Sequence, residues 1–324
     1  MSGPPWLARI GMECRVLGLF RKTLAGKGRV GVAFGGNHLA LAVMRRDGSQ
    51  PVLDRCEILP LDTTAGSALE VLRAAGIPRI PVSTVLSAAD YQLALVEAPE
   101  VPPAELRAAM RWRLKDSIDF RIEDAVIDVF DVPDQNRGGH GRMMYAVAAR
   151  RSAVNTHTQA LAGTPGFDAI DVPELCLRNL AALLPMASAG VALLHLGEAT
   201  ASIVLVRGKT FYLARQVDLS AGHDKAASQG QGRINAAGVV LELQRSLDYY
   251  ERHFDQPPIT RIAVSPAGAR ADELARELGR ETGFEVSTLD LNALVACATP
   301  IEASAQASCL LAVGAALREE QRSL

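Results

Sequence analysis

The residues with the clearest potential for chemistry lie in one short segment, LLHLGEATASIVLV, at positions 193 to 206. Its pattern predicts a strand, a tight turn at Gly197 and a second strand. Backbone N–H groups in such a turn can bind the phosphates of a nucleotide. Chains that hold phosphate in this way usually carry a carboxylate two residues before the glycine, but here that position is His195. The segment therefore raises the question whether this chain retains the strand–turn–strand backbone of a nucleotide site but has lost the carboxylate that such a site needs.

The first half of the chain contains a similar segment, VGVAFGGNHLALAVMRRDG, at positions 30 to 48. When the turns are aligned, Gly35 falls on Gly197 and Ala33 on His195, an offset of 195 − 33 = 162 residues. Each copy continues through a second turn into a third strand, which predicts a three-stranded meander at the start of each half. Chance similarity of two glycine turns is the alternative, but the matched order of the elements favours a duplicated architecture.

The same alignment argues against ATP hydrolysis. Mg²⁺ takes oxygen ligands, whereas Ala33 offers none and the nitrogen of His195 suits softer metals. Glu198 could substitute for the missing acid at the second turn. A third turn, at Gly268, begins a predicted helix, but Pro266 beside it removes an N–H donor.

We therefore expect no catalytic residue and no metal site, and cofactors that are either absent or limited to ATP or ADP with Mg²⁺. What remains is a vestigial nucleotide cleft, in which backbone groups of the three turns could still face an anion. Its expected residues are Gly35, Gly36, Asn37, Gly197, Glu198 and Gly268.

The composition is typical of a globular protein, with 324 residues, 48 % apolar residues and 22 % charged residues. A net charge of -2 excludes a general attraction to nucleic acid. Five cysteines without a CxxC pair favour a reducing cytoplasm. No apolar run approaches the ~18 residues that a membrane-spanning helix needs.

The first 27 residues form a basic leader with a single acid, Glu13. Two interpretations of residues 1–27 are open. One is a flexible leader that does not join the fold. The other is a contact with a membrane surface, in which Trp6, Leu17, Leu19 and Phe20 enter the interface.

The first half also carries an insertion, at about 98–172, in which a helix begun by a Pro-Pro pair precedes a hairpin. Trp112 lies away from the apolar stripe of that helix, between Arg111 and Arg113. Such a tryptophan could anchor a peptide, because aromatic and arginine residues dominate binding hot spots. The alternative is that Trp112 packs under the hairpin. The expected partner-binding residues are Trp112, Arg111, Arg113 and Phe120.

Four stretches carry a family likeness: GVAFGGNHLALAVM, ELRAAMRWRLKDSIDFRIEDAVIDVFDV, ALLHLGEATASIVLVRGKTFYLARQVDLS, and LELQRSLDYYERHF with the RIAVSPAGARADELARELG that follows it. They resemble the PilM family of type IV pilus assembly, and within it the MshI proteins of the mannose-sensitive haemagglutinin (MSHA) pilus. The most specific piece is the arginine–tryptophan helix that leads into an acidic hairpin, which generic actin-like ATPases do not share.

The resemblance implies an α/β fold of the actin-like, ribonuclease H-like class. Two lobes then face each other across a nucleotide cleft, and lobe 1 contains an inserted α/β subdomain. On this basis lobe 1 spans 28–188 with its insertion at about 98–172, and lobe 2 spans 189–308. A C-terminal helix at 309–322 packs back on lobe 1.

The resemblance also implies a structural role in the cytoplasm, peripheral to the inner membrane. Proteins of this family grip the cytoplasmic tail of a PilN-like bitopic partner and are connected indirectly to other platform components and the motor ATPase. No nucleic acid is expected as a partner, and a homo-oligomer stays open.

Two other functions are alternatives. An active actin-like ATP-binding protein or kinase would need the acids that Ala33 and His195 replace. The cytoplasmic domain of a type II secretion protein of the L type would need a membrane helix after the last residue.

Overall fold

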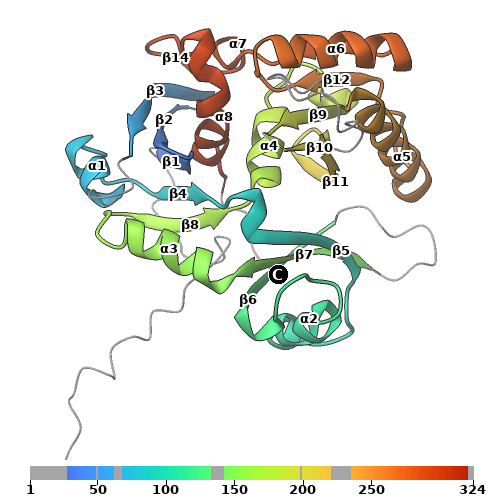
Figure 1. The fold of residues 1–324 in the computed structure, drawn as a ribbon, viewed down its shortest axis with the longest axis horizontal. Helices are drawn as coiled ribbons and strands as arrows, with labels where there is room; N and C mark the ends of the chain where they lie inside the picture. Colours follow the sequence, from blue (N-terminus) through green and yellow to red (C-terminus); the bar gives the residue numbers. More distant parts are fainter. Residues whose placement is uncertain are drawn as a thin grey trace, which may run out of the picture.

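The computed structural model describes residues 28–48, 50–61, 68–132, 142–197, 199–219 and 235–319. These residues form three β-sheets with helices between and around them (Figure 1). The six-stranded sheet is the basis of lobe 1, the five-stranded sheet of lobe 2, and the three-stranded sheet of the inserted subdomain. The basic leader expected at 1–27 and the expected cleft residue Glu198 lie outside the described residues.

Lobe 1 has the strand order β14-β3-β2-β1-β4-β8. The first three strands of the chain pair antiparallel, and β4 and β8 extend the sheet in parallel from β1. Interior residues of β1 are buried because α8 packs on one face of the sheet and α1 and α3 pack on the other. The strands are β1 (Gly28–Phe34), β2 (His38–Asp47), β3 (Gln50–Pro60), β4 (Val82–Val85), β8 (Phe167–Asp171) and β14 (Ala296–Cys297), and the helices are α1 (Ala68–Ala74), α3 (Arg151–Leu161) and α8 (Ala303–Ala316).

Lobe 2 has the strand order β11-β10-β9-β12-β13, again an antiparallel meander extended by two parallel strands. Helix α4 contacts this sheet and also α8, so it links the two lobes. The strands are β9 (Val191–Leu196), β10 (Thr200–Arg207), β11 (Thr210–Asp218), β12 (Arg261–Val264) and β13 (Glu285–Thr288), and the helices are α4 (Pro173–Ala181), α5 (Ala236–Phe254), α6 (Ala269–Thr282) and α7 (Leu291–Leu294).

Local signals set the ends of the helices in lobe 2. The side chain of Asn235 accepts a hydrogen bond of 3.0 Å from the backbone N–H of Gly238, which caps the start of α5. Helix α6 ends at Gly283, whose φ of +69° suits a glycine after the last helical turn.

The two halves of the chain share their strand register. In lobe 1, Ala33 lies opposite Ala40, and in lobe 2, His195 lies opposite Ser202. Both pairs differ by the offset seen in the sequence, since 195 − 33 = 162 and 202 − 40 = 162. The predicted duplication of the architecture is therefore confirmed at the level of individual strand pairs.

An irregularity in the second strand of each meander repeats with the same offset. The register between β2 and β3 shifts between Val43 and Met44, and the register between β10 and β11 shifts between Leu205 and Val206. Such bulges increase the local twist of a strand pair. Both lobes therefore carry the same twist-producing feature at the same place, since 205 − 43 = 162.

The inserted subdomain consists of the sheet β5-β7-β6 with a helix on one face. Its bounds differ from the expected 98–172. β5 precedes that range but pairs antiparallel with β7, and β8 falls inside the range but pairs with β4 of lobe 1. The unit therefore runs from β5 to β7. Its elements are β5 (Tyr91–Glu97), α2 (Leu106–Leu114), β6 (Ala125–Asp131) and β7 (Met143–Arg150).

Helix α8 approaches lobe 1 very closely at Gly31 of β1. A Cβ atom on Gly31 would lie only 1.9 Å from the carbonyl oxygen of Ala312. The helix begins at Ala303, earlier than the expected 309–322. The alanines from Ala303 onward favour helix, and the helix-breaking Pro300 lies before them in the chain.

Candidate functional site

The two positions where an actin-like site would need an acid lie on equivalent central strands. Ala33 is at the end of β1 and His195 is near the end of β9. Ala33 is buried and has no polar side-chain atom. The site geometry therefore depends on what His195 does.

The imidazole of His195 is engaged by a neighbouring strand. Its Nδ1 atom lies 3.1 Å from Oγ of Ser265, and the same Oγ accepts a hydrogen bond of 3.1 Å from the N–H of Leu196. Ser265 lies beside His195 because it directly follows β12, which runs parallel to β9. The backbone N–H of Ser265 donates to the carbonyl oxygen of Leu194 in β9. The described partner of His195 is therefore a side-chain hydroxyl group at the end of a parallel strand.

Burial lowers the pKa of His195 to about 4, so the imidazole is neutral at pH 7. With Leu196 N–H donating to Oγ, the hydroxyl hydrogen of Ser265 is free to point at a neutral Nδ1. Ser265 itself is fully buried and not accessible to a substrate. The pair is therefore a structural contact between two strands rather than a nucleophile with its base.

The glycine turns use some of the N–H groups that an anion would need. Gly35 N–H donates to His38 O at 2.8 Å, and Gly197 N–H donates to Thr200 O at 2.9 Å. These two amides therefore close their hairpins, and the expected place of Gly35 and Gly197 in a nucleotide cleft stays a prediction. Gly36 and Asn37 are exposed at the first turn.

The ring of His38 also covers the first turn. A Cβ atom on Gly35 would lie 2.3 Å from Cε1 of His38, so only glycine leaves room for this ring. At the third turn, Gly268 has a φ of +57° at the start of α6, a conformation that favours glycine for backbone reasons alone. Among the described residues, no group of three or more His, Cys, Asp or Glu side chains could hold a metal ion.

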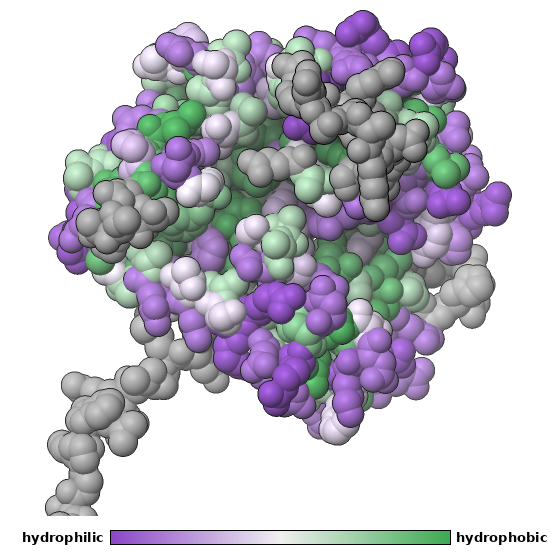
Figure 2. All heavy atoms as spheres, viewed as in Figure 1, coloured by the Kyte–Doolittle hydropathy of each residue, from purple (hydrophilic) through white to green (hydrophobic). Residues whose placement is uncertain are grey.

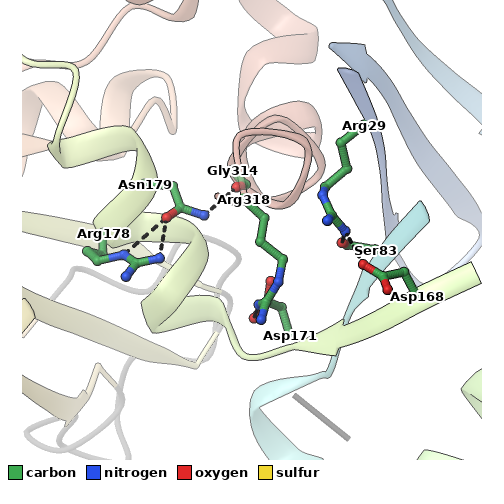
Figure 3. A network of polar contacts seen from close by, with 8 residues as sticks. All are labelled: Arg29, Ser83, Asp168, Asp171, Arg178, Asn179, Gly314 and Arg318. Carbon is green, nitrogen blue, oxygen red and sulfur yellow. Dashed lines mark hydrogen bonds and ion pairs between the residues drawn. The ribbon is translucent and has the colours of Figure 1, made fainter. Parts of the chain in front are cut away.

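A buried polar network lies where the lobes join (Figure 3). Asp171, the last residue of β8, is fully buried and forms an ion pair with Arg318, just after α8. Sequence reasoning missed this acid, because its partner is 147 positions away and no local pattern marks the pair. Since Arg318 neutralises the carboxylate, Asp171 does not replace the acids missing from the turns.

Figure 3 shows further contacts of this network. Arg29 of β1 donates to Ser83 at 2.7 Å and to Asp168 at 2.9 Å, which ties three strands of lobe 1 together. Asn179 of α4 donates to the carbonyl oxygen of Gly314 in α8 at 2.9 Å. The two helices that connect the lobes are therefore bonded to each other.

Trp112 of α2 is the most exposed large apolar residue of the described chain, with 76 % of its surface accessible. By helical counting it points away from the buried Leu106, Met110 and Leu114. The alternative that it packs under the hairpin is therefore wrong. Figure 2 shows apolar side chains between the lobes and at the inserted subdomain, within a largely hydrophilic surface.

The other three residues expected at the partner site differ in their exposure. Arg111 donates to the carbonyl oxygens of Ile122 and Ala125 and so supports the hairpin. Phe120 lies under the guanidinium of Arg150, with 4.4 Å between Cζ and the ring centre. Arg113 remains on the surface, with Glu97 at 3.7 Å. Trp112 and Arg113 are thus the two of the four that are exposed.

Comparison with known proteins identifies the fold. No protein-family model matches the sequence, and no curated protein sequence matches it either. A chain of a PilM-PilN type IV pilus biogenesis complex matches with a TM-score of 0.65 and 23 % identity, over 90 % of this chain and 98 % of that chain. A Bacteroides thetaiotaomicron protein with an actin-like ATPase fold and unknown function matches with a TM-score of 0.50 and 8 % identity, over 88 % and 95 % of the two chains.

A third similar structure is the cytoplasmic domain of EpsL, an inner membrane component of the type II secretion system of Vibrio cholerae. It has a TM-score of 0.47 and 14 % identity, and covers 90 % of this chain and 96 % of that domain. In the part of the chain that the structure describes, no helix has the length and apolar character needed to cross a membrane. The two matches with higher TM-scores, together with the paired meander sheets, show that this chain has the actin-like ATPase fold, with an inserted α/β subdomain in lobe 1.

Proposed function

We propose that the chain is a PilM-like adaptor of a type IV pilus assembly platform, and that it belongs to a system of the MSHA type. The observation that carries this proposal is the match over nearly the whole of both chains to a protein of a PilM-PilN complex. In this role the protein lies in the cytoplasm, peripheral to the inner membrane, and binds the cytoplasmic tail of a PilN-like bitopic protein. Contacts with other platform components and the motor ATPase are indirect.

We propose further that the nucleotide cleft is degenerate. Ala33 has no ligand atom, the imidazole of His195 is held by Ser265, and the amides of Gly35 and Gly197 close their own hairpins. Of the other expected cleft residues in the described part of the chain, Gly36 and Gly268 have no side-chain ligand atom, and Asn37 offers only an amide oxygen. The protein therefore acts by binding other proteins and not by turning over ATP.

The tail-binding surface that we propose is centred on Trp112. Its ring is exposed and flanked by Arg113, and an exposed tryptophan beside an arginine is a frequent anchor at interfaces. Arg111 and Phe120 take part indirectly, because their contacts hold the hairpin and the chain beside it in place.

The test is calorimetric titration of the purified protein with synthetic cytoplasmic tails of the bitopic proteins encoded beside it. We expect one tail to bind, and Trp112→Ala to weaken that binding by about 2 kcal/mol, a typical hot-spot value. Leu241→Ala is the matched control, because Leu241 is also an exposed apolar helix residue, at 49 %, but lies on α5 of lobe 2.

The outcomes separate two parts of the proposal. If no tail binds, the adaptor role is wrong. If a tail binds equally well to the wild type and to Trp112→Ala, the role stands and the surface lies elsewhere. Release of phosphate from ATP and Mg²⁺ above the rate of a blank would contradict the degenerate cleft.

A further inference from the structure

The inserted sheet has two faces that pack against different parts of the molecule. Side chains of a strand alternate between the faces, so Met144 and Ala146 of β7 lie on the opposite side from Tyr145. Met144 and Ala146 belong to the core under α2, whereas Tyr145 belongs to the large core that contains the strands of lobe 2. One face of the insertion is therefore closed by its own helix and the other by lobe 2.

Three aromatic rings form the centre of this second interface. Tyr145 and Phe130, from two strands of the insertion, are stacked with their ring centres 5.2 Å apart. Phe211 of β11 meets both rings edge-on, at 5.1 Å from Tyr145 and 5.7 Å from Phe130. Such geometries are the favourable ones for aromatic pairs, and they join the insertion of lobe 1 to lobe 2.

A hydrogen bond fixes the position of Tyr145 relative to lobe 2. The hydroxyl oxygen of Tyr145 accepts the backbone N–H of Ala214 at 3.2 Å. Ala214 lies on β11, the edge strand of lobe 2, whose other side is paired with β10. An edge-strand N–H that would otherwise need water is thus satisfied by a side chain of the insertion.

Glu174 provides a second contact at the same junction. This fully buried residue of α4 accepts a hydrogen bond of 2.6 Å from Tyr91 of the insertion and one of 3.3 Å from the amide of Gln216 in β11. One carboxylate therefore connects the inserted subdomain, the helix between the lobes and the edge of lobe 2.

A third contact joins the lobes near the end of the described chain. Glu319 pairs with Arg46 of lobe 1 at 3.2 Å and with Lys209 of lobe 2 at 2.6 Å. These side chains are more exposed than the aromatic cluster, so the contact is the weaker one. It nevertheless joins the two lobes through residues outside the inserted subdomain.

From these contacts we infer that the inserted subdomain is a clamp that holds lobe 2 at one angle to lobe 1, with Tyr145 as its central residue. The clamp goes beyond the proposed adaptor role and does not depend on it. Because its contacts cross from one lobe to the other, a change of the angle between the lobes requires the aromatic cluster and the Glu174 contacts to break.

Hydrogen exchange measured by mass spectrometry tests the clamp with two substitutions in lobe 2. Phe211→Ala removes the ring that meets the insertion, and we expect the amides of β7 to exchange about five times faster. Tyr250→Phe is the control, because the hydroxyl of Tyr250 is bonded to Arg207 within lobe 2, and we expect no change in β7. Equal exchange of β7 in the wild type and in Phe211→Ala would overturn the inference.

A conservative substitution and a measurement in solution distinguish loss of the clamp from general unfolding of the protein. Tyr145→Phe keeps the ring and removes only the acceptor of Ala214 N–H, so exchange should rise in β11 while the far strands of lobe 1 stay protected. In X-ray solution scattering, the wild type should fit one arrangement of the lobes, and the double variant Phe130→Ala/Tyr145→Ala should give a broader distance distribution. A wild-type curve that needs several lobe arrangements contradicts the clamp.

Discussion

The Nδ1 atom of His195 lies 3.1 Å from the Oγ atom of Ser265, at one of the two positions where an active actin-like ATP-binding protein is expected to carry an acid. This contact joins the ends of two parallel strands of lobe 2, β9 and β12. It turns a position suited to chemistry into part of the packing of the sheet. The effect of this contact on the free energy of unfolding can be measured, as can the effects of three other contacts.

The contact predicts a particular dependence of stability on pH. Burial lowers the pKa of His195 from 6.5 to about 4, so between these values the unfolded chain binds the proton more strongly than the folded chain. The free energy of unfolding should therefore fall by at most about 3 kcal/mol as the pH drops from about 6.5 to about 4. Urea denaturation at a series of pH values measures it.

The variant His195→Gln isolates this effect, because glutamine does not titrate. Asp128 also titrates near this range, since burial raises its pKa to about 6, and a raised carboxyl pKa favours the folded state at lower pH. Asp128 is present in both proteins, so its effect cancels in the difference. Parallel stability curves for the wild type and the variant would contradict the lowered pKa.

The close approach of α8 to β1 predicts that Gly31→Ala is severely destabilising. The new Cβ atom would meet the carbonyl oxygen of Ala312, a backbone atom of a helix that cannot move alone. We expect a loss of about 3 kcal/mol or more, measured by urea denaturation. Gly36→Ala should change little, because no atom lies within 4 Å of its added Cβ.

The buried ion pair predicts a large cost when one partner is removed. Asp171 is fully buried and the side chain of Arg318 is 12 % exposed, so Arg318→Ala leaves the buried carboxylate without its ion-pair partner. We expect a loss of about 3–5 kcal/mol at pH 7. The surface pair of Arg280 and Glu277 is the control, and Arg280→Ala should cost less than about 1 kcal/mol. Similar losses for both variants would show that Asp171 is not isolated from water.

The aromatic contact between the insertion and lobe 2 predicts a measurable coupling energy. In a double-mutant cycle of Phe130→Ala and Phe211→Ala, we expect a coupling of about 0.5–1.5 kcal/mol in the free energy of unfolding. A cycle of Phe130→Ala with Leu241→Ala, which removes an exposed side chain of α5, should give no coupling. Additive effects in the first cycle argue against a direct contact across the interface.

The sequence predicts those features that depend on residues close together in the chain. The glycine turns and the two meanders follow from strand patterns around Gly35 and Gly197, and the register confirms their alignment. Helix α6 begins at the predicted turn, directly after Gly268. The stripe of α2 places Trp112 opposite the buried residues.

The features that were missed depend on contacts between distant residues. β5 was left out of the insertion because its partner residues lie far along the chain, with Tyr91 opposite Ala149. The same is true of the pairing of Asp171 with Arg318 and of Tyr145 with the edge of lobe 2. The bond from the Gly35 amide to the carbonyl oxygen of His38 is the exception, since these residues are close in the chain and the bond depends on how the turn closes.

The arrangement of the first lobe has a consequence for how the protein is made. Its opening strand is covered by α8, and its edge at β3 is completed by β14, so elements between Ala296 and Ala316 finish a sheet begun at Gly28. During synthesis the apolar surface of the early strands stays uncovered until the residues of α8 have left the ribosome. A nascent chain that stops before Ala303 should therefore remain dependent on chaperones.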